Sequence, residues 1–78
     1  MNDYDVLKEI VRNGSDLTLC RPIDDDVLRE LASLAKETGA KLTVRTKMMD
    51  YETILEISAT YSKSVSFVYG LEKFEKDN

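Results

Sequence analysis

The chain has 78 residues, of which 42% are hydrophobic and 33% are charged, and its formal net charge is −4. This length fits one domain, near the lower limit for folding without staples, and the composition argues against disorder. The acidic balance, with no basic stripe, argues against direct binding to nucleic acid or to an anionic membrane. The single cysteine cannot close an internal disulfide, which favours the reducing cytoplasm. We expect no signal peptide and no membrane span, because no apolar run approaches roughly 20 residues.

An eight-residue pattern recurs along the chain. Each copy opens with acidic residues and then places an aliphatic residue, a glutamate and another aliphatic residue at matching offsets. The copies occupy residues 3–10, 24–31 and 50–57. Each copy is followed by a short β-prone run, at residues 17–20, 42–45 and 65–68. Self-similarity of this kind predicts one helix–strand unit used three times.

The first two units have clear boundaries. The first helix is predicted over residues 3–12, where the apolar side chains share one face, and Gly14 follows it as a left-handed stop. The second helix is expected to begin after Asp24, whose carboxylate suits the N-cap position, and to end at Gly39. A strand over residues 41–46 follows the second helix.

The third unit is ambiguous from residue 51 to residue 61. Ile54, Ile57 and Tyr61 share a helical face, but Leu55, Ile57 and Ala59 also alternate with polar residues as in a strand. The recurring pattern favours a helix followed by a strand over residues 65–69. If the segment is instead a strand, the fold is α+β with a C-terminal antiparallel meander.

The preferred prediction is therefore an α/β fold of two layers. Two right-handed crossovers in the same direction give a three-stranded parallel sheet in sequential order, with the helices on one face. The second face would be open, since the strands alternate apolar and polar residues, and it would display Thr18, Cys20, Thr43, Arg45, Ser66 and Val68. The two sheet edges would be exposed and would invite pairing. We expect a single domain over residues 1–70 and a charged tail over residues 71–78.

No catalytic constellation stands out. The chain has no histidine, so a Cys-His or Ser-His pair is excluded within one subunit, and Cys20 is interpreted as a packing residue. The acidic helix starts could hold Mg²⁺ or Ca²⁺, but Arg21, Arg45 and Lys47 are expected nearby and would repel a cation. Glu9, Glu30 and Glu56 share one register and are expected to pair with neighbouring basic residues. We therefore expect no metal, no cofactor and no enzymatic activity.

The leading functional hypothesis is a small non-enzymatic protein–protein interaction module that binds another protein or a copy of itself. Binding would use a strand edge, the open sheet face, or a patch of tyrosine and methionine at the helix starts, where Tyr4 and Tyr51 occupy the same register. The candidate interaction residues are Tyr4, Asp24, Asp25, Asp26, Arg45, Met48, Met49, Asp50, Tyr51, Glu52 and Tyr69.

The alternative hypothesis is an acidic inhibitor or regulator, of a kind known among small bacterial and phage proteins, that occupies a nucleic-acid-binding site on a partner protein. Its carboxylates would stand where phosphates otherwise lie. The mimicking surface would be Asp24, Asp25, Asp26, Asp50 and Glu52. The chain is also expected to be polarised, with a basic end formed by Lys36, Lys41 and Lys63, which could guide association between copies.

Overall fold

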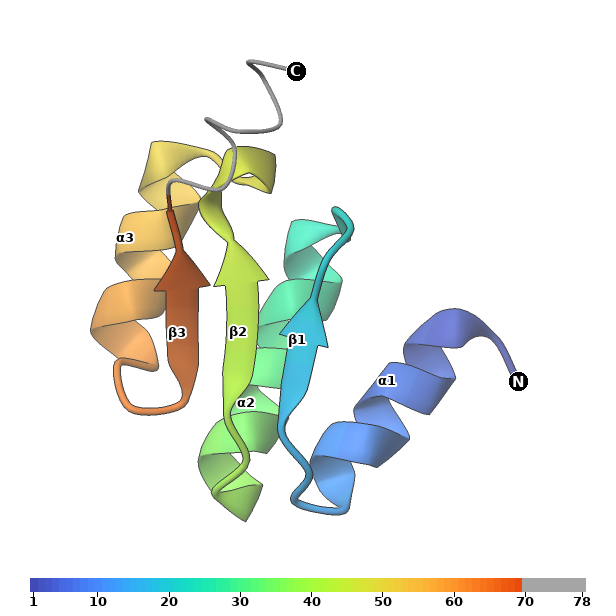
Figure 1. Ribbon diagram of the computed structural model, residues 1–78. Helices are drawn as coiled ribbons and strands as arrows, with labels where there is room; N and C mark the ends of the chain where they lie inside the picture. Colours follow the sequence, from blue (N-terminus) through green and yellow to red (C-terminus); the bar gives the residue numbers. More distant parts are fainter. Residues whose placement is uncertain (70–78) are drawn as a thin grey trace.

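Three helix–strand units alternate along the chain in the computed structural model, which describes residues 1–69 (Figure 1). The elements are α1 (Asp3–Arg12), β1 (Leu17–Leu19), α2 (Asp25–Thr38), β2 (Leu42–Arg45), the 3₁₀ turn η1 (Thr46–Met48), α3 (Tyr51–Thr60) and β3 (Val65–Val68). The expected tail at residues 71–78 lies outside the described residues. None of the helices in residues 1–69 has the length and apolar character that crossing a bilayer requires.

The three strands form one parallel sheet in the order β1-β2-β3. Leu42 of β2 is paired with Leu17 of β1 and with Val65 of β3. In Figure 1 the viewer looks onto the bare face of the sheet, with α2 and α3 behind it and α1 packed beside α2 at the β1 side. The two-layer α/β prediction is confirmed, and the antiparallel meander is excluded because residues 51–60 are helical.

The burial pattern of α3 shows why the helix forms. In a strand, Leu55 and Ile57 would lie on the same face, since side chains alternate with a period of two. Here Ile57 is 0% exposed and Leu55 is 68% exposed. Thr53, four residues before Ile57, is also buried, as the helical period requires. The packing of one helical face against the sheet therefore outweighs the strand propensity of this segment.

The core lies between the sheet and the helices. Its fully buried larger side chains come from both layers and are Val11, Leu28, Leu31, Leu42 and Ile57. On the open face, Thr43 is paired with Thr18 on one side and with Ser66 on the other, so three hydroxyl side chains form a row across the strands. This is the face that the alternating sequence predicted to be polar.

The helix ends follow the predicted stops more closely than the predicted caps. Gly14 and Gly39 both adopt positive φ, at 85° and 81°, and both lie at the ends of helices. Asn2 caps α1, since its side-chain oxygen accepts from the backbone N–H of Asp5 at 2.9 Å. Asp24 is at the N-cap position of α2 as expected, but its carboxylate makes no cap hydrogen bond. The side chain is exposed, where water competes for the carboxylate.

Candidate protein-binding surface

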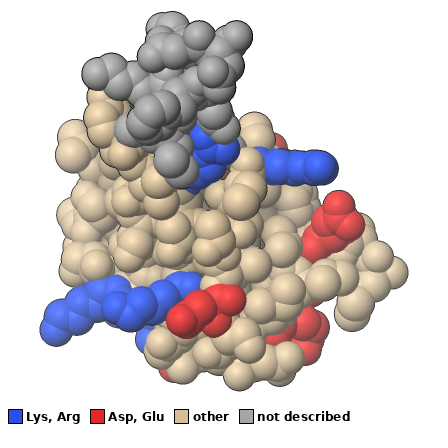
Figure 2. Space-filling model, in the orientation of Figure 1, with Lys and Arg blue, Asp and Glu red and all other residues tan. Residues whose placement is uncertain are grey.

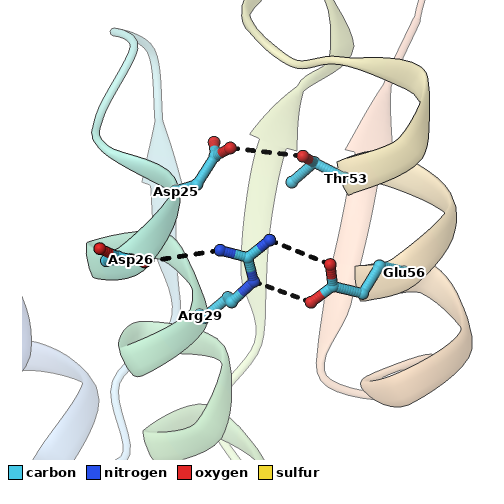
Figure 3. A network of polar contacts seen from close by, with 5 residues as sticks. All are labelled: Asp25, Asp26, Arg29, Thr53 and Glu56. Atoms are coloured by element: carbon cyan, nitrogen blue, oxygen red, sulfur yellow. Dashed lines mark hydrogen bonds and ion pairs between the residues drawn. The ribbon is translucent and has the colours of Figure 1, made fainter.

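A polar network fixes α3 against α2 (Figure 3). Arg29 of α2 donates from Nε and Nη2 to the two carboxylate oxygens of Glu56 of α3, at 2.8 and 2.9 Å. A second link joins the same helices, because Thr53 Oγ1 donates to Asp25 Oδ2 at 3.3 Å. Arg29 Nη1 also lies 3.6 Å from Asp26 Oδ1. Both helices therefore keep one relative rotation, which decides the side chains that α3 presents outward.

The protonation behaviour of this pair follows from its geometry. The hydrogen bonds from Arg29 are the main cause that lowers the pKa of Glu56, and its partial burial opposes them. The same contact raises the pKa of Arg29. The recurring glutamates pair as the sequence predicted, since Glu9 pairs with Arg12 and Glu30 pairs with Lys8 at 3.2 Å. These glutamates therefore pair with basic side chains of the same helix or of a neighbouring helix.

The acidic helix starts do not converge on a metal site. Asp25 and Asp26 contact Thr53 and Arg29, and all five carboxylates, with Asp24, Asp50 and Glu52, are exposed. Within residues 1–69, no group of three acidic or cysteine side chains lies close enough to hold a metal ion. Cys20, which we expected to pack, is instead a free and exposed thiol just beyond the end of β1.

The expected tyrosine–methionine patch is not assembled. Tyr4 is half-buried on α1, while Tyr51 is 85% exposed on α3. Figure 1 places these two helices near opposite edges of the sheet, at β1 and at β3. Met49 is half-buried and packs against the core. The side chain of Met48 lies outside what the structure describes. Residues that share a register occupy equivalent points of successive helix–strand units. Because each unit is displaced sideways across the sheet, Tyr4 and Tyr51 lie far apart.

Three exposed apolar side chains belong instead to α3 and to the end of β3, while Met1 and Val6 are exposed at the N-terminus and on α1. Tyr51 and Leu55 belong to α3, and Tyr69, 89% exposed, follows β3 directly. Thr53 and Glu56 mark the side of α3 that faces α2. Leu55 is roughly 200° around the helix from Thr53, at about 100° per residue, so it faces away from α2. We call the side of α3 away from α2, together with the outer edge of β3, the α3–β3 flank. It comprises Tyr51, Leu55 and residues 65–69.

Among the described residues, no further strand pairs with the outer edge of β3. The oxygen of Ser64 accepts from the N–H of Leu42 at 2.8 Å, and the oxygen of Val68 accepts from Thr46 Oγ1 at 3.2 Å. Residues 64, 66 and 68 therefore turn their backbone groups toward β2. Because these groups alternate in direction along a strand, the N–H and C=O of Phe67 point outward. In Figure 1, α3 lies behind β3 and extends beyond it on this outer side.

The flank also lacks the features that keep strand edges apart. Natural edge strands are commonly protected by charged side chains, proline or bulges. Residues 65–69 are Val-Ser-Phe-Val-Tyr, and the flank positions of α3 are equally uncharged. Figure 2 shows the same character over the open sheet face, where most of the surface is uncharged and Lys and Arg side chains gather at the lower left.

A hollow of about 420 Å³ lies at the other end of α2 and α3, and Lys36, Tyr61 and Lys63 line it. The ammonium nitrogen of Lys36 is 5.9 Å from the centre of the Tyr61 ring, a cation–π distance. Lys36 thus belongs to the expected basic end of the molecule. Both helices end here, and Lys36 in the last turn of α2 complements the carbonyl end of that helix. We therefore interpret this hollow as part of helix termination.

Comparison of the chain with protein-family models, with curated proteins and with solved structures found no match. Sequence reasoning named Tyr51 and Tyr69 as interaction candidates but missed Leu55. The signal was present in the helical spacing, since Leu55 falls outside the face shared by Ile54, Ile57 and Tyr61.

Proposed function

We propose that the protein is a non-enzymatic protein–protein interaction module and that the α3–β3 flank is its binding surface. The observation that carries this proposal is that Tyr51 and Leu55 of α3 and Tyr69 after β3 are exposed, and that residues 65–69 carry no charge. Exposed apolar groups of this kind, gathered beside unpaired backbone groups, are typical of protein interfaces. A binding module of this type needs no general base, which agrees with a chain that contains no histidine.

The mode of binding that fits this surface is strand addition. A partner strand would pair with the outward N–H and C=O of Phe67 and so extend the sheet beyond β3. Backbone hydrogen bonds would supply affinity, and contacts with Leu55 and Tyr51 would supply side-chain specificity. The partner is a protein, with no direct role for nucleic acid or membrane, and the reducing cytoplasm is the compartment that suits the free thiol of Cys20.

Affinity capture from lysate of the native host tests this function with three baits. The wild-type chain is compared with Leu55→Lys, which places a charge on the flank, and with Val6→Lys. Val6 is also an exposed apolar residue, 43% exposed, but it lies on α1. We expect the same protein to be retained by the wild type and by Val6→Lys and to be lost by Leu55→Lys. Equal retention of that protein by all three baits would contradict the proposed surface.

The acidic-inhibitor hypothesis uses a different surface and is distinguished by salt. Asp24, Asp50 and Glu52 are exposed at the ends of α2 and α3 that follow the strands, which favours it. Binding through these carboxylates would weaken steeply as salt is raised from about 0.05 to 0.5 M, because the Debye length shortens from over 10 Å to under 5 Å. Binding through the flank should weaken little. The double substitution Asp24→Asn/Asp50→Asn should abolish the first mode and spare the second.

A further inference from the structure

We infer that the α3–β3 flank binds a second copy of this chain, through antiparallel pairing of β3 with β3 of the other copy. The inference rests on the proposed function and names its partner. The two copies would be related by a two-fold axis perpendicular to the sheet. The sheet would then contain six strands, and the helices of both copies would lie on the same face.

The direction of the backbone groups fixes the centre of this pairing. The N–H and C=O of Phe67 point outward, so Phe67 of each copy exchanges two hydrogen bonds with Phe67 of the other on the axis. Ser66 then lies opposite Val68 of the second copy, as a non-hydrogen-bonded pair. The Phe67 side chain packs on the helix side of β3 but is only half-buried within one chain. In the dimer the two Phe67 rings would cover one another.

The charges of the chain favour this arrangement over others. Two copies with a formal charge of −4 each repel, so they approach most easily through an uncharged surface. The flank supplies that surface. Antiparallel pairing also sets the acidic start of α3, with Asp50 and Glu52, toward the turn before β3 in the other copy, where Lys63 is exposed. Each end of the interface therefore brings opposite charges together.

A second copy of the chain also provides a strand that can pair with the outer edge of β3. The complement of an uncharged parallel-sheet edge is another unpaired edge strand, and β3 of a second chain is one. A standard interface takes about 600 Å² or more from each partner, which is roughly a ninth of the 5397 Å² surface of this chain. That area would be drawn from the four residues of β3, from Tyr69 and from the exposed side of α3.

Sedimentation equilibrium of the purified full-length chain tests the dimer. We expect the wild type and Val6→Lys to show twice the chain mass of 8.9 kDa at high concentration. Leu55→Lys should dissociate with a constant at least roughly tenfold higher, as for a residue central to an interface. A wild-type chain that remains monomeric up to about 1 mM, a concentration at which even weak contacts form, overturns the inference. The inference also fails if Leu55→Lys and the wild type self-associate equally.

Disulfide trapping tests the register. In a Cys20→Ser background, Ser66→Cys/Val68→Cys places two thiols opposite two thiols of the second copy, within the separation that a disulfide spans. The matched control is Thr18→Cys with native Cys20, because these residues are equally spaced on the other outer strand region. We expect mild oxidation to give a covalent dimer of the first variant at micromolar concentration and none of the control. Equal trapping of both variants would overturn the register.

The two proposals fail in different ways. A monomeric chain that captures another protein through Leu55 contradicts the second-copy inference and leaves the binding function standing. A chain whose capture and self-association are both indifferent to Leu55 contradicts the binding function as well.

Discussion

Arg29 and Glu56 are 27 residues apart in sequence, yet they meet across α2 and α3 in a two-point contact with distances of 2.8 and 2.9 Å. A bidentate arginine–carboxylate contact restrains direction as well as distance. It turns Leu55, the residue before Glu56, away from α2 and toward solvent. The contact that orders the helical layer therefore also sets the binding surface that we propose.

Replacing Glu56 with Gln should produce a pH-dependent loss of stability. Since the contact holds the folded-state pKa of Glu56 below its ordinary value of 4.5, the stabilisation is present above that value and is lost as pH falls through the folded pKa. Urea unfolding of wild type and Glu56→Gln should thus differ at pH 7 and converge toward pH 3. Glu37→Gln, on an exposed glutamate of α2 outside the network, is the control. A difference that stays constant with pH would contradict this account.

Replacing Thr38 with Val should loosen α1. Thr38 Oγ1 lies 3.0 Å from the backbone oxygen of Val11 and 2.9 Å from that of Leu34, so its hydroxyl links the ends of α1 and α2. We expect a loss of about 0.5–1.5 kcal/mol in the free energy of unfolding, the usual worth of one hydrogen bond. Amide exchange in α1 should accelerate. Thr38→Ser keeps the hydroxyl and should be as stable as the wild type. If Thr38→Ser and Thr38→Val are equally destabilising, the hydroxyl of Thr38 does not stabilise α1.

Two alanine substitutions in α3 should differ widely in their effect. Ile57 is fully buried, so Ile57→Ala is expected to cost about 2–5 kcal/mol in the free energy of unfolding. Leu55→Ala, measured in dilute solution, should change it by about 0.5 kcal/mol or less. Ile57→Val, expected to cost about 0.5–1.5 kcal/mol, covers the case in which the alanine variant does not fold. Equal losses of stability for Leu55→Ala and Ile57→Ala would indicate that residues 51–60 form a strand, in which both side chains share one face.

Replacing Gly39 with Ala should destabilise the end of α2. Gly39 has φ of +81°, and a β-carbon added there would meet nothing within 4 Å, so any cost is conformational and none is steric. We expect a loss of about 1–2 kcal/mol in the free energy of unfolding, the left-handed penalty for an ordinary residue. Gly39→Asn should lose less, because Asn tolerates this region better. Thermal unfolding of both variants provides the measurement. A Gly39→Ala variant as stable as the wild type would contradict this prediction.

Much of the fold was readable in the sequence because the signals are local. The glycine stops, the acidic helix starts and the alternation in the strands each act over a few residues, and the recurring pattern favoured helix for α3 where the local period was ambiguous. Asp24 occupies the predicted N-cap position, but its carboxylate makes no cap hydrogen bond, because water competes for an exposed carboxylate.

The candidate surface was only partly predictable. Tyr51 and Tyr69 were expected to bind because of their residue type. The exposure of Leu55 follows from its helical spacing, but the direction in which it faces required the rotation of α3. That rotation depends on the contact between Arg29 and Glu56 across 27 residues of sequence. The separation of Tyr4 from Tyr51 likewise depends on the lateral placement of the units in the sheet, which the repeat does not reveal. Tertiary contacts therefore decide which of the exposed side chains stand together.

The most direct test of the proposed surface is amide hydrogen exchange at Phe67 as the protein is diluted. Our account predicts that the Phe67 N–H is protected at high concentration and exchanges faster on dilution or in Leu55→Lys. The N–H groups of Ser66 and Val68, which face β2, should stay protected throughout. A Phe67 amide that exchanges at the rate of an open edge at every concentration, and that gains no protection from any bound protein, would contradict the account.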